Sequence, residues 1–198
     1  YESGDVEKLL EIAALCNGAK IDPPSDRTAA WSVIGDPTDG ALIVAALKYG
    51  INVKRRLAEK PVVHILPFDF TRKRMTTVHK LNGDVLFYTK GAPRSVLSVC
   101  SKILVDGEVE EATRKRLRSA EAKIREFAKE GLRLIAVAYR KMPKSEYSKD
   151  GVLERDMVFV GLAAMRDPPR FEVKEAVAKA KQAGIRTVII TGDYGPTA

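Results

Sequence analysis

The pair Asn82-Gly83 constrains the fold of this chain more than any other feature of its sequence. Residues 75–81 and 84–90 are rich in β-branched and aromatic side chains, and only these two residues separate them. An Asn-Gly pair favours a tight two-residue turn, so the pattern predicts an antiparallel hairpin. A third β-type run at residues 62–66 precedes it, which predicts an antiparallel sheet in this half of the chain.

Helices are expected on both sides of these strands along the sequence. Residues 5–17 carry an apolar stripe at helical spacing. Further along, Asp36 is placed to cap a helix that Pro37 begins. The remaining elements are a short helix from Pro93, a hairpin around Asp106-Gly107, a long helix over residues 111–129 and a strand over 132–139. The first 156 residues are therefore expected to form one α+β unit, an antiparallel sheet flanked by helices.

The pattern changes after Asp156. Residues 158–165 form a continuous apolar run, a helix is expected from Asp167-Pro168 to Ala183, and residues 187–190 form a second apolar run. This spacing is typical of a strand–helix–strand unit with a parallel crossover. Since about 40 residues cannot bury a doubly wound sheet alone, the sequence predicts a boundary at this point, with units 1–156 and 157–198.

Composition excludes several classes of function. The chain has two cysteines and two histidines, with no cluster at metal-ligand spacing, so no metal site is expected. No apolar run approaches the ~20 residues of a membrane-spanning helix. The formal net charge of +8 attracts anions such as nucleic acid or phosphorylated ligands. The sequence contains neither the phosphate-binding motif G-x-x-x-x-G-K-S/T nor the dinucleotide-binding motif G-x-G-x-x-G after a strand. A bound nucleotide would therefore be held by its base, with its phosphates projecting outward.

The stretch from Phe68 to Val78 places an aromatic ring beside a run of cations. Phe68 offers an apolar face to a base, a contact worth ~1–3 kcal/mol where base stacking has been measured. If the stretch is a strand, Lys73 projects toward a ligand while Arg72 and Arg74 point to the other face. The alternative is that Phe68 belongs to the core and the cations shield an edge strand.

A second candidate site lies where Lys90 ends a strand, just before Gly91 and a helix begun by Pro93. Gly91 lets a ligand approach the backbone, and a helix N-terminus favours anions. A Lys-Gly turn is common, so this pattern indicates little by itself.

Two further candidates follow the apolar runs of the second unit. Thr191, Gly192 and Asp193 come after one run, where ligands bind in open parallel sheets, so a hydroxyl and backbone amides there can hold a phosphoryl group. Asp193 can also approach a magnesium ion, or the segment is simply a turn. Asp167 ends the other run, and Arg170 lies in the first helical turn, where a cation is unfavourable. Arg170 therefore has an anionic ligand or an acidic neighbour on its own helix.

Taken in order, six segments resemble the P-type cation-transporting ATPases of the type-2 branch, which contains calcium-pump-like and sodium-pump-like members. They are GDPTDGAL, FDFTRKRM, KGAPR, GLRLIAVAYR, MRDPPR and AGIRTVIITGDYGPTA, and they extend to Ala198. The resemblance implies a nucleotide-binding domain, residues 1–156, inserted into a phosphorylation domain of the haloacid-dehalogenase type. Residues 157–198 would be a Rossmann-like β-α-β piece of that second domain.

The resemblance also implies roles for individual residues. Those around the nucleotide would be Phe68 stacked on adenine, Asp39 near the base edge, Lys73, Lys90 and Gly91 lining the pocket, and Arg133 reaching toward the phosphates. Those of the phosphorylation site would be Thr191, Gly192 and Asp193, with Asp167 and Arg170 near the hinge and that site. Three residues depart from the family pattern: Asp39 replaces the usual Glu, Arg94 replaces an acid, and Phe70 occupies a position that is more often small, polar or Arg.

The function implied is that of the ATP-binding part of a membrane-embedded ion pump, on its cytoplasmic side. The complete protein would use ATP and Mg²⁺, with the rest of the phosphorylation domain, an actuator domain and transmembrane helices as partners in the same polypeptide. The family's Asp-Lys-Thr-Gly-Thr motif is not in this sequence. The chain is therefore expected to bind ATP without turnover. It is also expected to be a monomer and to bind no nucleic acid. The alternatives are a nucleic-acid-binding module and a stand-alone phosphatase of the haloacid-dehalogenase type.

Overall fold

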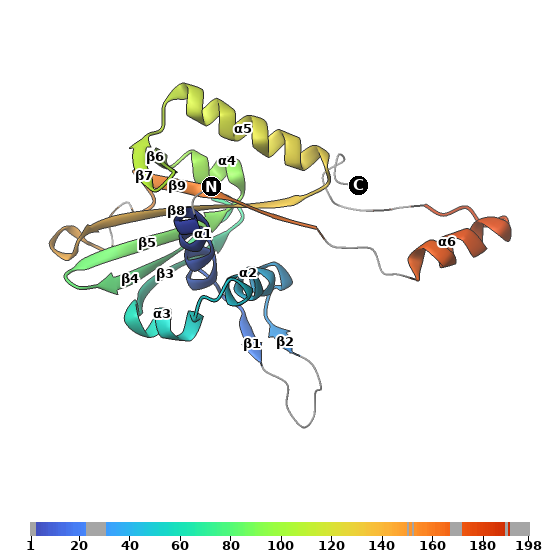
Figure 1. Ribbon diagram of the computed structural model, residues 1–198, viewed down its shortest axis with the longest axis horizontal. Helices are drawn as coiled ribbons and strands as arrows, with labels where there is room; N and C mark the ends of the chain where they lie inside the picture. Colours follow the sequence, from blue (N-terminus) through green and yellow to red (C-terminus); the bar gives the residue numbers. More distant parts are fainter. Residues whose placement is uncertain are drawn as a thin grey trace.

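A single seven-stranded sheet forms the centre of the molecule (Figure 1). The computed structural model describes residues 3–22, 31–149, 151, 153–166, 172–188 and 190. The strands are β3 Val62–Asp69, β4 Arg74–Leu81, β5 Asp84–Gly91, β6 Cys100–Val105, β7 Glu108–Glu111, β8 Arg133–Pro143 and β9 Met157–Met165. Their order in the sheet is β3-β4-β5-β8-β9-β6-β7, and only β6 and β9 pair in parallel. The predicted α+β class is confirmed.

The Asn-Gly hairpin forms as predicted. Leu81 pairs with Asp84 across the turn, and Asn82 and Gly83 have φ angles of 40° and 87°. Positive φ at both central residues is the signature of the turn that matches the twist of the two strands. The hairpin between β6 and β7 repeats this geometry at Asp106-Gly107.

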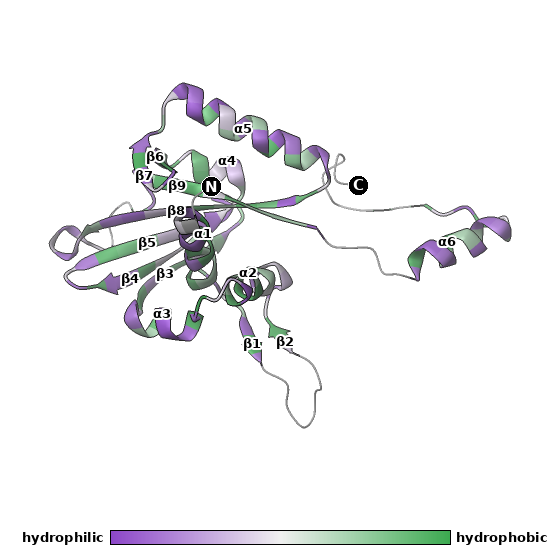
Figure 2. Ribbon diagram, viewed as in Figure 1, coloured by the Kyte–Doolittle hydropathy of each residue, from purple (hydrophilic) through white to green (hydrophobic). Residues whose placement is uncertain are grey.

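Helices cover both faces of the sheet. The described helices are α1 Ser3–Leu15, α2 Pro37–Lys48, α3 Val53–Glu59, α4 Pro93–Leu97, α5 Arg114–Lys129 and α6 Val173–Gln182. Of these, α1 packs on one face of the sheet, and α4 and α5 pack on the other. Because side chains alternate along a strand, Tyr88 packs with Ile12 of α1 on one face. Phe87 packs with Val96 of α4 on the other. Figure 2 shows both polar and apolar residues on α5, as expected of a helix that covers a sheet with one face.

Some elements were not predicted. The strands β1 Lys20–Asp22 and β2 Ser32–Ile34 form a small antiparallel sheet beside α2. The helix α3 also went unrecognised, and Asn52 caps it by accepting a hydrogen bond from the Arg55 amide. Within the described residues, no helix is long and apolar enough to cross a membrane.

The part of the chain after Asp156 is arranged differently from the prediction. β9 lies between β8 and β6, so the strand assigned to the second unit belongs to the sheet of the first. α6 begins only at Val173 and lies apart from the sheet (Figure 1). The strand predicted at residues 187–190 is wrong, because residues 187, 188 and 190 are not in a strand and no described strand pairs with them. The division into two domains stays a prediction, and any second domain starts after β9.

A buried polar network joins α1 to the sheet. The Glu11 carboxylate accepts hydrogen bonds from Lys60 Nζ and from the Tyr88 hydroxyl. His79 is fully buried beside it, with Nδ1 2.8 Å from the Lys60 carbonyl oxygen and Nε2 2.7 Å from Thr77 Oγ1. A neutral ring satisfies both contacts by donating from Nδ1 to the Lys60 carbonyl and accepting at Nε2 from the Thr77 hydroxyl.

The free energy of unfolding is expected to fall as the pH drops below about 6.5. Burial lowers the pKa of His79 below its ordinary value of 6.5, so the unfolded chain binds the proton more tightly than the folded chain. Stability from this group is therefore present above pH 6.5 and is lost at lower pH, by at most about 1.4 kcal/mol per pH unit. Urea unfolding of wild type and His79→Gln between pH 5 and 7.5 measures this. An equal slope in both chains would contradict it.

Candidate functional site

Four neighbouring strands place their ends at one edge of the sheet. In the register of these strands, Asp69 of β3 pairs with Arg74 of β4, Arg74 pairs with Gly91 of β5, and Gly91 pairs with Ala136 of β8. Because the strands are antiparallel, the ends of β3 and β5 lie beside the start of β4 and the first part of β8, which extends past Ala136 to Arg133. This edge therefore gathers residues from segments that lie far apart in the sequence, and most of the predicted nucleotide-site residues are among them.

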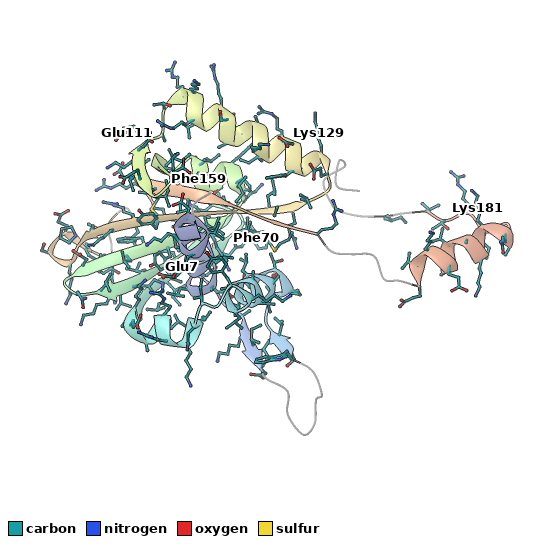
Figure 3. The ribbon with its side chains drawn as sticks, in the orientation of Figure 1. Glu7, Phe70, Glu111, Lys129, Phe159 and Lys181 are labelled. Atoms are coloured by element: carbon teal, nitrogen blue, oxygen red, sulfur yellow. The ribbon has the colours of Figure 1, made fainter. Side chains whose placement is uncertain are left out.

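The aromatic ring at this edge is accessible. Phe68 is 52% exposed and Phe70, labelled in Figure 3, is 86% exposed. Their ring centroids lie 5.4 Å apart with the planes at 87°. The interpretation of Phe68 as a core residue is therefore wrong. Two exposed aromatic rings in contact form an apolar patch beside a run of cations.

Lys73 lies in a turn rather than in a strand. Its φ of 50° is left-handed, and its amide donates to the Asp69 carbonyl oxygen at 2.6 Å. The Asp69 carboxylate caps the same turn by accepting from the amides of Thr71 and Arg72. The expected alternation of side chains along a strand does not apply here, since residues 70–73 form the turn between β3 and β4. Lys73 is nevertheless an exposed cation beside the aromatic pair.

Lys90 and Asp39 are partners of one another. Lys90 Nζ lies 2.5 Å from Asp39 Oδ1, and Lys90 as a residue is only 4% exposed. The other carboxylate oxygen, Asp39 Oδ2, accepts from the Gly18 amide at 3.1 Å. Lys90 is therefore already paired with Asp39 and is not an unpaired cation beside a ligand pocket. Its ion pair fixes the start of α2 against β5, and the Asp39 side chain remains 19% exposed.

Arg133 lies close to the same helix start. Its Nη1 donates to Thr38 Oγ1 at 3.1 Å, and the residue is exposed. Asp36 caps α2 beside it, and the hydrogen bonds from Thr38 lower the pKa of that carboxyl, with Arg133 adding to the effect. Arg133 thus brings an exposed guanidinium to the edge where Asp39 lies.

Gly91 allows a close approach between two parts of the backbone. A Cβ atom at this position would lie 2.4 Å from the Lys73 carbonyl oxygen and 2.6 Å from Arg74 Cα. That same carbonyl accepts from the Ala92 amide at 2.9 Å. The glycine therefore brings the end of β5 against the turn that carries Lys73.

The other predicted site residues cannot be placed. Asp167, Arg170, Thr191, Gly192 and Asp193 lie outside the described residues, so their roles stay predictions. Among the residues that are described, no group of three or more His, Cys, Asp or Glu side chains could hold a metal ion.

The rings and cations of the candidate site lie on an exposed surface. A cavity of about 360 Å³ lies elsewhere, where Glu7, Ile51, Arg55 and Arg56 contribute to its lining. An open edge with two exposed rings and several cations can bind a flat anionic molecule by one face while the rest of it projects into solvent.

Sequence reasoning missed one residue that contacts this edge. Glu154 accepts hydrogen bonds from Arg72 and Arg74, which flank Lys73. The sequence offered no signal for it, because a single Glu in a polar segment does not reveal its partner.

Comparisons with known proteins agree with the resemblance. The family model described as P-type ATPase, cytoplasmic domain N, matches residues 5–172. A calcium-transporting ATPase of Bacillus subtilis is 38% identical over 100% of this chain and 22% of its own length. Calcium-transporting ATPase 1 of Lactococcus lactis is 33% identical over 98% of this chain and 21% of its own length. An endoplasmic reticulum calcium ATPase of Aspergillus fumigatus is 33% identical over 99% of this chain and 23% of its own length.

The chain spans about a fifth of the length of these curated relatives. Both the family match and the relatives cover nearly all of the sheet and its helices. The chain therefore belongs to the P-type ATPase family, within the part of it described as cytoplasmic domain N.

Proposed function

We propose that this chain binds ATP through the sheet edge formed by β3, β4, β5 and β8. The observation that carries the proposal is the exposed ring of Phe68 at the edge that also holds Lys73 and Arg133. Adenine lies on the Phe68 face, since stacking on an accessible ring suits any flat base. Asp39, held by Lys90, accepts from the exocyclic amine of the base.

The phosphates point away from the base site. No glycine-rich loop wraps them, so they contact the exposed cations Lys73 and Arg133 and otherwise face solvent. Mg²⁺ keeps several waters and binds mainly through nucleotide phosphates in such sites. This fits an edge where the described residues offer cations to the phosphates and no carboxylate cluster to the metal.

In the complete protein, the γ-phosphate would be presented to an aspartate outside this chain. The relatives are named calcium-transporting ATPases, which supports cation transport driven by ATP as the activity of the whole pump. This part would lie on the cytoplasmic side and work with the remaining phosphorylation domain, an actuator domain and transmembrane helices. Thr191, Gly192 and Asp193 would then belong to the site that accepts the phosphoryl group, with Asp167 and Arg170 close to it.

Calorimetric titration of the chain with ATP tests this proposal. The expected result is saturable binding of one ATP per chain without release of phosphate, and competition by other adenine nucleotides. A titration with a single-stranded oligonucleotide at two salt concentrations is the comparison. Tight oligonucleotide binding that weakens steeply with salt, together with no heat from ATP, would favour the nucleic-acid alternative and refute the proposal.

A further inference from the structure

Glu154 makes charged contacts to the turn between β3 and β4 and to the first residue of β4. Its side chain is only 7% exposed, and its carboxylate accepts from Arg72 Nη1 at 2.6 Å and from Arg74 Nε at 2.8 Å. Thr76 Oγ1 donates to it as well, at 2.8 Å. A buried carboxylate with two guanidinium partners and a hydroxyl donor forms charge-assisted bonds of the stronger kind.

These partners surround the segment that carries the aromatic pair. Arg72 also donates to the Pro67 carbonyl oxygen at 2.7 Å, directly before Phe68. Arg74 Nη1 donates to Ser95 Oγ of α4 at 3.0 Å. The carboxylate thus connects three parts of the chain: the segment before β9, both ends of the turn, and the helix that follows β5.

Other bonds also hold the turn, among them one from Ser95 Oγ of α4 to the Arg72 carbonyl oxygen. The Asp69 carboxylate bonds to amides of its own turn, which shapes the turn without fixing its position on the domain. The Ala92 amide fixes the Lys73 end through the Lys73 carbonyl oxygen. The Phe68 end is tied through Arg72, whose guanidinium lies 2.6 Å from the Glu154 carboxylate and, more distantly, 4.0 Å from the Asp69 carboxylate.

We propose that Glu154 is a positioning residue of the nucleotide site: it holds the turn of residues 69–73 so that the face of Phe68 stays open to the base. This inference rests on the proposed binding of ATP. A ring that is already oriented loses less conformational freedom when the base binds, and a small displacement of such a group weakens binding strongly. Glu154 would not touch the nucleotide itself.

Glu11 provides a matched control for Glu154. Its side chain is also 7% exposed, and it too has two cationic partners, Lys60 and Arg56, and a hydroxyl donor, Tyr88. It bonds α1 to α3 and β5 and has no bond to the turn of residues 69–73. Replacing either carboxylate by an amide removes a buried charge of the same kind, so a general loss of stability affects both variants.

The experiment compares Glu154→Gln with Glu11→Gln. We expect Glu154→Gln to raise the ATP dissociation constant about tenfold, and to shift the backbone amide signals of residues 70–73 before ATP is added. Glu11→Gln should lower the unfolding midpoint while leaving the dissociation constant within twofold of wild type. If Glu154→Gln does not fold, Arg72→Gln replaces it, because it breaks the tie to Pro67 while Glu154 keeps Arg74 and Thr76.

The outcomes distinguish the positioning role of Glu154 from the proposed binding of ATP. Equal ATP affinity in wild type and Glu154→Gln, or an equal loss in Glu11→Gln, would overturn the positioning role and leave ATP binding intact. A wild-type chain that binds no ATP would overturn the proposed function and this inference with it.

Discussion

Phe68→Ala is expected to raise the ATP dissociation constant by one to two orders of magnitude. Stacking of a base on an aromatic ring contributes ~1–3 kcal/mol, and each ~1.4 kcal/mol changes the constant tenfold. Because the Phe68 ring is 52% exposed, its removal leaves no large cavity in the core, and the unfolding midpoint should change little. Calorimetric titration gives the constant, and thermal unfolding gives the midpoint on the same samples.

Two companion variants sharpen this result. Phe68→Tyr keeps an aromatic face and should bind ATP nearly as wild type does. Phe70→Ala removes the neighbouring ring, which meets Phe68 edge-on. Its effect should be smaller than that of Phe68→Ala, since the Phe68 face remains. An unchanged dissociation constant in Phe68→Ala would refute the stacking role.

Asp39→Ala is expected to lower the free energy of unfolding by about 3 kcal/mol. The substitution leaves the Lys90 ammonium buried without its counter-ion, and breaking a buried pair from one side costs ~3–5 kcal/mol. The lower end applies because the Asp39 side chain is 19% exposed and water can partly replace it. Urea unfolding measures the change. A loss below about 1 kcal/mol would show that the pair behaves as an exposed one.

The double variant Asp39→Ala with Lys90→Met separates stability from binding. Replacing both members of a buried pair with apolar groups is often close to neutral, so most of the lost stability should return. ATP affinity should stay reduced, because the acceptor for the base amine is still missing. Recovery of both properties would mean that Asp39 acts only through the fold.

Local patterns predicted much of the fold. The Asn82-Gly83 turn and the Asp36-Pro37 helix start depend on the backbone preferences of adjacent residues, and both form as expected. The place of β9 could not be predicted in this way. Its apolar run suits a buried strand in any sheet, and only pairing with β8 and β6 decides which sheet it joins. The apolar run at residues 187–190 also suggested a strand, but its described residues pair with no strand of the sheet.

The candidate site, like the fold, could be predicted only in part from the sequence. The resemblance pointed to residues at this edge, and the structure places Phe68 near the end of β3, Lys73 in the turn that follows and Arg133 at the start of β8. Their partners depend on contacts between distant residues. The Lys90–Asp39 pair joins positions 51 residues apart, and the Arg72–Glu154 pair joins positions 82 residues apart. Strand alternation also misplaced Lys73, because Asp69 caps a turn at that point.

The most direct measurement is an NMR titration of the chain with ATP, followed through its backbone amide signals. If the base lies on the edge formed by β3, β4, β5 and β8, the signals of Phe68, Lys73, Gly91 and Thr38 should shift together and saturate, while those of α5 stay constant. Shifts confined to the basic helix α5 or to the cavity near Arg55, with no change at Phe68, would contradict nucleotide binding at this edge.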